Sequence, residues 1–296
     1  MIEARSLTKR YGSTVAVDDL SFTVPAGAVT GFLGPNGAGK TTTLRMLLGL
    51  VRPTSGDATI GGERYVRLPR PAARVGAVLE ASAFHPGRSG RNHLRTVATA
   101  ADIPERRVDE VLDVVELTAV ARRRVKTYSL GMRQRLAIAQ ALLGDPDVLL
   151  LDEPANGLDP QGIRWLRDFL RSYAADGRTV FVSSHVLAEI AQTVDSVAII
   201  NRGKLVAHES LMEVRARAVA GVRVRSPQAA RLREALAAAG IETTDVGEGR
   251  LVARIESSER VGEIAAANGV VLHELTAESS SLEDVFLELT GESRPQ

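Results

Sequence analysis

The sequence contains no cysteine and no long apolar run, and it carries almost no net charge. Without cysteine the chain can form neither a disulfide nor a thiolate metal site, which fits a reducing compartment. A net charge of +1 provides no overall field for nucleic acid or a membrane surface. We expect the chain not to span a membrane, because it has no uncharged apolar run of about 18 residues. We also expect no signal peptide, since no apolar segment follows Met1–Arg5.

Lysine is scarce as well, yet one of the four lysines lies in the most distinctive stretch of the chain. Residues 34–41 read GPNGAGKT, between an apolar, strand-like segment at 29–33 and a helical pattern at 42–48. Glycines let successive backbone N–H groups point inward, and a helix N-terminus adds partial positive charge, so this unit predicts a phosphate cradle. We expect Lys40 to reach the β- and γ-phosphates and Thr41 to bind Mg²⁺. The nucleotide-binding residues predicted here are Gly34, Pro35, Asn36, Gly37, Ala38, Gly39, Lys40, Thr41 and Thr42.

A second candidate site is the acidic pair that ends the apolar strand predicted at 147–151. Asp152 is placed to hold the hydration shell of Mg²⁺ opposite Thr41, and Glu153 can accept a proton from an attacking water. A strand that ends in two acids is by itself commonly a solvated turn, but a glycine loop upstream favours the catalytic interpretation. His185 ends a similar apolar strand, a position where a histidine is most often a hydrogen-bonded residue without catalytic work.

The order of predicted elements indicates an α/β fold. Alternating apolar and polar residues predict short antiparallel strands before residue 33. Further along, helices alternate with apolar strands at 75–80, 147–151, 179–185 and 196–200. This alternation predicts a parallel sheet that is covered on both faces and binds ligands at the carboxyl ends of its strands. Residues from about 85 to 143 show helical spacing without a strand, which predicts a helical insertion.

The pattern restarts near residue 213 and predicts a second, smaller α+β domain. Its order is β-α-β-β-α-β followed by a last helix, which resembles a ferredoxin-like unit. The strands are expected at 221–225, 241–246, 251–255 and 270–275, and the helices at 227–239, 259–267 and 282–289. We therefore expect a first domain at 1–215 and a C-terminal accessory domain at 216–296.

Residues 128–135, YSLGMRQR, resemble the signature motif of ATP-binding cassette (ABC) ATPases and precede the Asp-Glu strand as in that family. Residues 156–159, NGLD, resemble the family's D-loop, Ser184-His185 resembles its switch histidine, and Tyr11 its adenine-stacking aromatic. An aromatic residue before a glycine is otherwise usually a packing residue. The resemblance covers roughly residues 2–215 in the family's order. It implies a P-loop NTPase fold with a RecA-like parallel sheet, an antiparallel β subdomain and the helical insertion.

The resemblance also implies how ATP is bound. In the family, two subunits pack head to tail, and each ATP lies between the glycine loop of one and the signature helix of the other, here between Lys40 and Ser129. Ser129 at a helix start, with Gly131 allowing close backbone approach, would form a second anion site. Asp159 is expected at the same nucleotide site, and His185 is expected to contact the γ-phosphate. A homodimer would hold two competent sites, because both catalytic candidates are present.

Two positions depart from the family pattern. Leu130 stands where the family usually has glycine, although Ser129 and Gly131 are intact. Glu80 stands where most members carry a glutamine that touches Mg²⁺ and couples to the membrane domains. Glutamate can still ligate Mg²⁺, so Glu80 is predicted as a metal and nucleotide contact. The stretch from 75 to 91 resembles the branch associated with antibiotic, multidrug and bacitracin-type export.

These observations favour an ATP-hydrolysing subunit that uses ATP and Mg²⁺ to power export of a drug, antibiotic or lipid-like compound. Its expected partners are separately encoded permease subunits, which place it at the cytoplasmic face of the cell membrane, or in the cytoplasm when free. The alternative is a soluble ABC ATPase that acts on ribosomes or nucleic acid. A duplicated cassette, a long coiled coil or a basic patch would favour it, and none is evident between Lys40 and Ser129, so no nucleic-acid partner is expected. A third possibility is a non-hydrolysing regulatory cassette.

Overall fold

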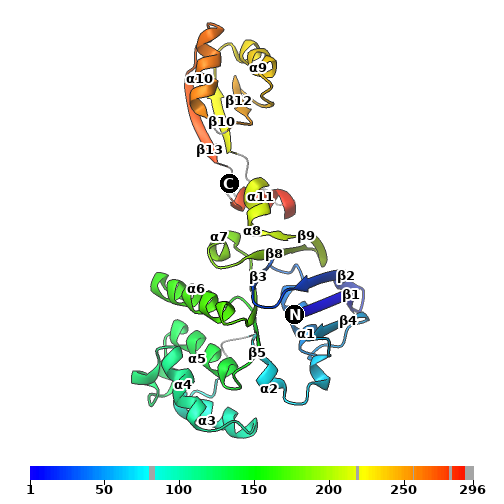
Figure 1. The fold of residues 1–296 in the computed structure, drawn as a ribbon, viewed down its shortest axis with the longest axis vertical. Coiled ribbons are helices and arrows are strands. Elements are labelled where there is room, and N and C mark those ends of the chain that lie inside the picture. The colour runs from blue at the N-terminus through cyan, green and yellow to red at the C-terminus, as the bar shows by residue number, and fades with distance from the viewer. Residues whose placement is uncertain (80–83, 218–219, 256, 280–281, 291–296) are drawn as a thin grey trace. The chain divides into compact units, whose positions relative to one another are not determined.

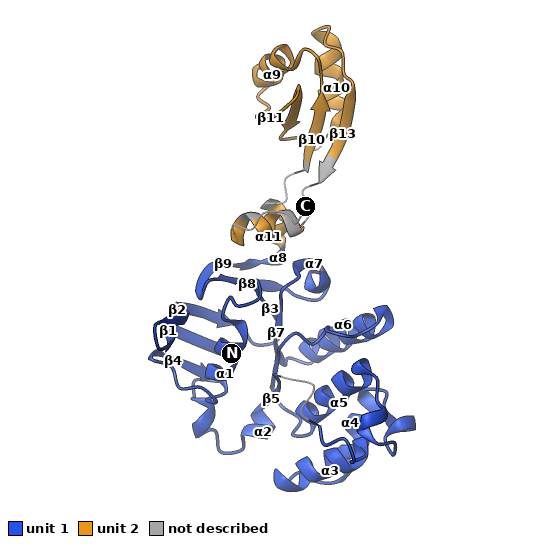
Figure 2. Ribbon diagram, turned by 180° about the vertical axis from the view of Figure 1, so that it is seen from behind, with its two compact units in different colours: residues 1–211 blue, residues 212–296 orange. Residues whose placement is uncertain are grey.

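A computed structural model describes residues 1–79, 84–217, 220–255, 257–279 and 282–290. The chain forms two compact units, residues 1–211 and residues 212–296 (Figure 2). None of the helices in these described ranges is long and apolar enough to cross a membrane.

A three-stranded antiparallel sheet opens the first unit. It consists of β1 (Ile2–Tyr11), β2 (Thr14–Val24) and β4 (Ser55–Ile60), in the order β2-β1-β4. The alternation of apolar and polar residues buries one face of each strand and leaves the other toward solvent. The antiparallel strands predicted before residue 33 are therefore present.

A six-stranded sheet forms the centre of the first unit (Figure 1). Its order is β5 (Val75–Val78), β6 (Val148–Leu151), β7 (Thr179–Ser184), β3 (Val29–Leu33), β8 (Ser196–Asn201) and β9 (Lys204–Ser210). The first five strands are parallel, as their continuous apolar runs predict. The edge strand β9 is antiparallel and was not predicted, because its half-buried residues lack such a run.

Helices cover both faces of this sheet in the first unit. Figure 1 shows α6 (Pro160–Ala175) on one side, and α1 (Lys40–Leu47) with the antiparallel sheet on the other. Phe22, Phe32 and Phe181 join the two sheets, with ring centroids 5.0–5.5 Å apart. The predicted helical insertion contains α3 (Gly90–Ala100), α4 (Arg106–Val114) and α5 (Leu130–Leu142). The short helices are α2 (Pro71–Arg74), α7 (Leu187–Ile190) and the 3₁₀ turns Tyr65–Arg67, Thr118–Val120 and Val125–Thr127.

The second unit contains a four-stranded antiparallel sheet in the order β11-β12-β10-β13. Its elements are α8 (Leu211–Arg217, which begins at the boundary), β10 (Ala220–Arg225), α9 (Ala229–Ala238), β11 (Thr243–Gly247), β12 (Arg250–Ala253), α10 (Ser258–Ala267), β13 (Glu274–Ser279) and α11 (Leu282–Thr290). The succession from β10 to β13 is the predicted β-α-β-β-α-β. The strand expected at 270–275 was misplaced, because Val270 and Leu272 pack against the apolar core before β13 begins.

Candidate functional site

The glycine loop connects the buried end of β3 to the start of α1. Two of its glycines are required by close packing. A Cβ at Gly34 would lie 2.3 Å from the carbonyl oxygen of Ile200, and one at Gly39 would lie 2.5 Å from that of Ala16. Gly39 also has a φ of 108°, a conformation that L side chains rarely adopt. No side chain caps α1, so the backbone N–H groups of its first turn are open to a ligand.

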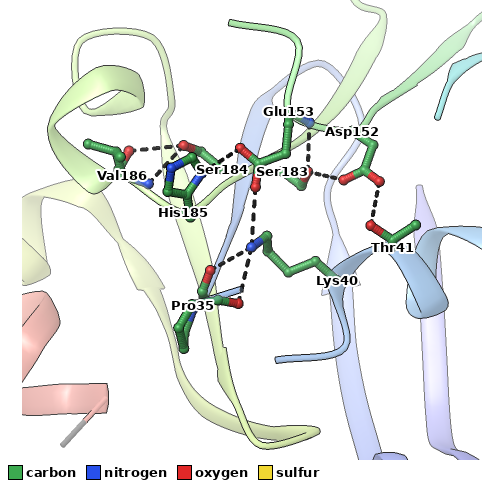
Figure 3. A network of polar contacts seen from close by, with 10 residues as sticks. Pro35, Lys40, Thr41, Asp152, Glu153, Ser183, Ser184, His185 and Val186 are labelled. Atoms are coloured by element: carbon green, nitrogen blue, oxygen red, sulfur yellow. Dashed lines mark hydrogen bonds and ion pairs between the residues drawn. The ribbon is translucent and has the colours of Figure 1, made fainter. Parts of the chain in front are cut away.

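Lys40 is almost fully buried, with 6% of its surface exposed. Its ammonium donates to the carbonyl oxygens of Gly34 and Pro35, at 2.6 and 3.3 Å, and lies 3.2 Å from Oε1 of Glu153 (Figure 3). A buried ammonium needs such partners, because an unpaired charge in the interior is strongly unfavourable. The loop carbonyls and the glutamate therefore hold the positive charge at the mouth of the phosphate cradle.

Asp152 is held from both sides at the end of β6. One carboxylate oxygen accepts a hydrogen bond from Thr41 Oγ1 at 2.6 Å, and the other accepts one from Ser183 Oγ at 2.5 Å. The backbone N–H of Asp152 donates to the carbonyl of Val78 at 2.7 Å. This fixed carboxylate beside a threonine hydroxyl is the oxygen-rich donor set that Mg²⁺ prefers.

Glu153 connects the lysine to the histidine. Its Oε2 lies 2.9 Å from Nδ1 of His185, while Oε1 faces Lys40 (Figure 3). The backbone of Glu153 has a φ of 48°, in the left-handed region that only a few non-glycine residues adopt. The N–H of this turn donates to Ser183 Oγ at 2.9 Å, so the strained backbone is held by a buried hydroxyl.

Ser129 and Asp159 occupy equivalent positions at two other helix starts. Ser129 caps α5 by accepting from the N–H of Met132 at 3.2 Å, and Asp159 caps α6 by accepting from the N–H of Gly162 at 2.7 Å. Leu130 packs on the D-loop, since a Cβ at Gly157 would lie 2.0 Å from its side chain. The signature and D-loop motifs are thus neighbours, as are Gly131 and Leu158, which a Cβ at Gly131 would meet at 3.4 Å.

The structure joins five of the predicted residues in two sets, Lys40–Glu153–His185 and Thr41–Asp152, and Ser183 links the two sets. Within the described ranges, no hydrogen bond or ion pair joins Ser129 or Asp159 to this group. Tyr11 is half exposed at the end of β1 and has the Lys9 ammonium 4.9 Å from its ring centroid. The predicted contact Glu80 lies outside the described residues.

Sequence reasoning missed Ser183, which touches both acids of the predicted site. It is fully buried, and its hydroxyl donates to Asp152 and accepts from the N–H of Glu153. The signal was its position at the carboxyl end of an apolar strand, two residues before His185. Only the parallel register of β6 and β7, with Leu151 opposite Val182, brings Ser183 beside Asp152.

The glycine loop with its lysine, joined through Thr41 to an aspartate at the end of a parallel strand, defines a P-loop nucleotide-binding protein. Residues 17–156 match the family model described as ABC transporter. Residues 220–283 match a model described as a domain of unknown function, DUF8746.

Curated relatives resemble the chain along nearly its whole length. The uncharacterized ABC transporter ATP-binding protein YhcH of Bacillus subtilis is 38% identical, over 100% of this chain and 98% of that protein. The bacitracin transport ATP-binding protein BcrA of Bacillus licheniformis is 38% identical, over 98% of this chain and 97% of that protein. A solved structure described as the ATP-binding subunit of an ABC transporter is similar with a TM-score of 0.66 at 29% identity, over 73% of this chain and 92% of that one. The chain belongs to the family of ABC transporter ATP-binding proteins, which confirms the predicted family and fold.

Proposed function

We propose that the chain is the ATP-hydrolysing subunit that powers export of an antibiotic or related compound through separate membrane permease subunits. The observation that carries this proposal is the connected group of Lys40, Glu153 and His185 beside the Thr41–Asp152 pair. The export of an antibiotic is supported by the similarity to BcrA, which is described as a bacitracin transport protein. The permease would place the chain at the cytoplasmic face of the cell membrane.

ATP would bind with its phosphates over the open N-terminus of α1. The backbone N–H groups of the loop and the ammonium of Lys40 would hold the β- and γ-phosphates, and Tyr11 is the candidate for stacking on the adenine. The hydroxyl of Thr41 and the carboxylate of Asp152 fit Mg²⁺, and Glu80 is a further candidate ligand. When bound, Mg²⁺ supplies positive charge that stabilises the phosphate oxygens.

Glu153 would act as the general base. A phosphate group that takes over the Lys40 ammonium leaves the Glu153 carboxylate free to accept a proton from the attacking water. The water oxygen then bonds to the γ-phosphorus, the bond to the bridging oxygen breaks, and ADP leaves. His185, 2.9 Å from Glu153, is placed to orient that carboxylate and to contact the γ-phosphate.

A second copy would complete each site. Ser129 and Gly131 at the start of α5 have no bond to the glycine loop of their own chain among the described residues, so they are available to the nucleotide of another copy. Asp159 would lie at the same interface, because the D-loop packs on the signature motif. We propose a head-to-tail homodimer that closes on ATP and opens after hydrolysis, with residues 216–296 as an accessory domain.

The test is Glu153→Gln, which keeps the size of the side chain but removes its basicity. The variant should bind ATP as well as the unchanged chain does, remain as an ATP-bound dimer, and release phosphate at least a hundredfold more slowly, as is typical for loss of a general base. Glu63→Gln, at an exposed turn, is the control and should hydrolyse normally. Full phosphate release by Glu153→Gln would contradict the assignment. The permease itself should copurify with the chain from membranes.

A further inference from the structure

Charge is unevenly distributed in the helical insertion. Residues 84–143 contain eleven Arg and Lys against six Asp and Glu, although the whole chain has a net charge of only +1. The carboxylates pair with one set of these cations: Arg91, Arg95, Arg106, Arg107 and Arg135. Another set, which we call the basic patch, is exposed and forms no ion pair with a carboxylate of the described chain: Arg88, Arg122, Arg123, Arg124 and Lys126.

Backbone pairing gathers the basic patch from two segments. The N–H of Val125 donates to the carbonyl of Arg88 at 2.8 Å, and the N–H of Lys126 donates to the carbonyl of Pro86 at 3.2 Å. These bonds place Arg88 beside the arginine run that begins at Arg122. The sequence analysis found no basic patch between Lys40 and Ser129, and the structure corrects that interpretation. Residues 122–126 read RRRVK, and backbone pairing adds Arg88, which lies more than thirty residues away in the sequence.

A buried tyrosine, Tyr128, packs against both segments that carry the basic patch. Tyr128 is 3% exposed, and its hydroxyl donates to the carbonyl of Val120 at 3.0 Å. The same hydroxyl lies where a Cβ at Gly90 would be only 2.4 Å away, so both segments pack on one ring. Burial raises the pKa of the Tyr128 hydroxyl, and the proton that this hydroxyl carries makes the hydrogen bond to Val120. The backbone beneath the arginines is consequently fixed, while their side chains extend into solvent.

We infer that the basic patch binds the anionic phosphate headgroups of the membrane surface. This inference rests on the proposed function, which brings the chain to a membrane. A cluster of four to eight cations is typical of segments that bind acidic lipids, and guanidinium groups form paired hydrogen bonds with phosphate. The arginines of the basic patch form no ion pair with a carboxylate of the described chain, so they break no such pair when they bind a phosphate headgroup.

Single-stranded nucleic acid is the less suitable partner. Such binding usually combines cations with aromatic rings on which bases stack. Among the described residues of the insertion, Tyr128 is buried and Phe84 packs edge-on against His93 at 4.9 Å. The exposed ring of His85 accepts a hydrogen bond from the N–H of Gly87, so the basic patch lacks a series of open rings on which successive bases could stack. The basic patch presents exposed guanidinium and ammonium groups, which can bind the phosphates of lipid headgroups without base stacking.

The experiment measures binding of the full chain to vesicles made of equal parts phosphatidylglycerol and phosphatidylcholine. The variant replaces Arg122, Arg123 and Arg124 with alanine. Each cation near an anionic surface contributes about fivefold to binding, so the triple variant should bind roughly a hundredfold more weakly. Binding of the unchanged chain should also fall as salt rises, because the interaction is screened. The matched control replaces three exposed, unpaired arginines elsewhere, Arg67, Arg164 and Arg171, and should keep most of the binding.

Each outcome separates the alternatives. Loss of vesicle binding in the Arg122–Arg124 variant alone, with unchanged ATP hydrolysis, supports the inference. No binding by the unchanged chain, or equal loss in the control, overturns it. Tighter binding to a single-stranded RNA oligonucleotide than to vesicles would assign the patch to nucleic acid and overturn it as well. A chain that hydrolyses ATP but ignores vesicles contradicts only this inference, whereas one that binds vesicles without hydrolysing ATP contradicts only the proposed function.

Discussion

Two helices of the first unit, α1 and α5, differ in whether a side chain bonds to the backbone N–H groups of their first turn. At α1 the residue before the helix is Gly39, and no side chain bonds to the first-turn N–H groups. At α5 the residue before the helix is Ser129, whose hydroxyl accepts from Met132 N–H. Glycine in place of a capping side chain costs only about a few tenths of a kcal/mol, and it leaves the first-turn N–H groups free to bond to a ligand. We therefore interpret the open start of α1 as the phosphate-binding feature of the proposed site, whereas the capped start of α5 is stable alone and would offer its hydroxyl to a ligand later.

The comparison predicts that a chain binds ATP first and pairs with a second copy afterwards. The α1 site has its lysine, threonine and acids joined within one chain, so a single chain should bind ATP. The hydroxyl of Ser129 already accepts a hydrogen bond from Met132, and no bond among the described residues joins it to the α1 site. We therefore expect Ser129 to contact nucleotide only when a second copy approaches. Variants at the two helix starts should consequently affect different measurements.

The largest effect is expected from Lys40→Ala, which breaks the α1 site itself. Removing the buried ammonium deletes the charge that faces the phosphates, and loss of a preorganised donor of this kind costs about 10²–10³-fold in turnover. ATP binding, followed by calorimetry, should weaken along with hydrolysis. Lys204→Ala serves as control, because its side chain is 68% exposed and its ammonium pairs with Asp18, which lies outside the glycine loop. Unchanged ATP binding by Lys40→Ala would refute the phosphate cradle.

The next variant, Ser129→Glu, changes the start of α5 and leaves the α1 site intact. A carboxylate placed against the γ-phosphate of a second copy repels it, at a cost of several kcal/mol. We expect about a hundredfold loss of hydrolysis and of ATP-dependent dimerisation, while ATP binding to the single chain stays unchanged. Ser129→Thr keeps the hydroxyl and the cap and should retain activity. Weakened ATP binding by the Ser129→Glu monomer would show that the two helix starts are not independent.

Ser183→Ala should have a smaller effect, because it removes a positioning residue. Asp152 loses one donor, and the Glu153 N–H loses its acceptor, each in a buried setting. A lost hydrogen bond of about 1 kcal/mol corresponds to roughly fivefold, so we expect that drop in kcat at saturating ATP. Ser183→Thr, which keeps the hydroxyl, should restore it. Failure of threonine to restore kcat in a folded protein would indicate a packing role alone.

The smallest effect is expected from Asp159→Ala in the free chain. This carboxylate caps α6 at 2.7 Å, so its removal should lower the free energy of unfolding by about 1 kcal/mol. Denaturant unfolding measures this difference, and Asp159→Asn, which also caps, should be close to neutral. A loss much above that value would mean that Asp159 has a further partner in the chain.

Sequence analysis predicted the features that depend on short, contiguous segments of the chain. The glycine loop, its flanking strand and helix, and the acids at 152–153 could be recognised because each is a short, contiguous pattern. Ser183 could not, because its contact with Asp152 depends on the register between β6 and β7. The edge strand β9 was missed because its exposed face weakens the apolar signal. The run at 122–126 is visible in the sequence but was overlooked in a chain with a net charge of only +1, and the addition of Arg88 to it depends on backbone bonds between distant segments.

The most direct measurement mixes two inactive chains. Lys40→Ala has an intact Ser129, and Ser129→Glu has an intact glycine loop, so a head-to-tail pair of the two contains one complete site. Because random mixing makes half of the dimers mixed, the mixture should recover about a quarter of normal ATP turnover, provided that the two sites act independently. A mixture that stays as inactive as its components would contradict a site shared between two copies.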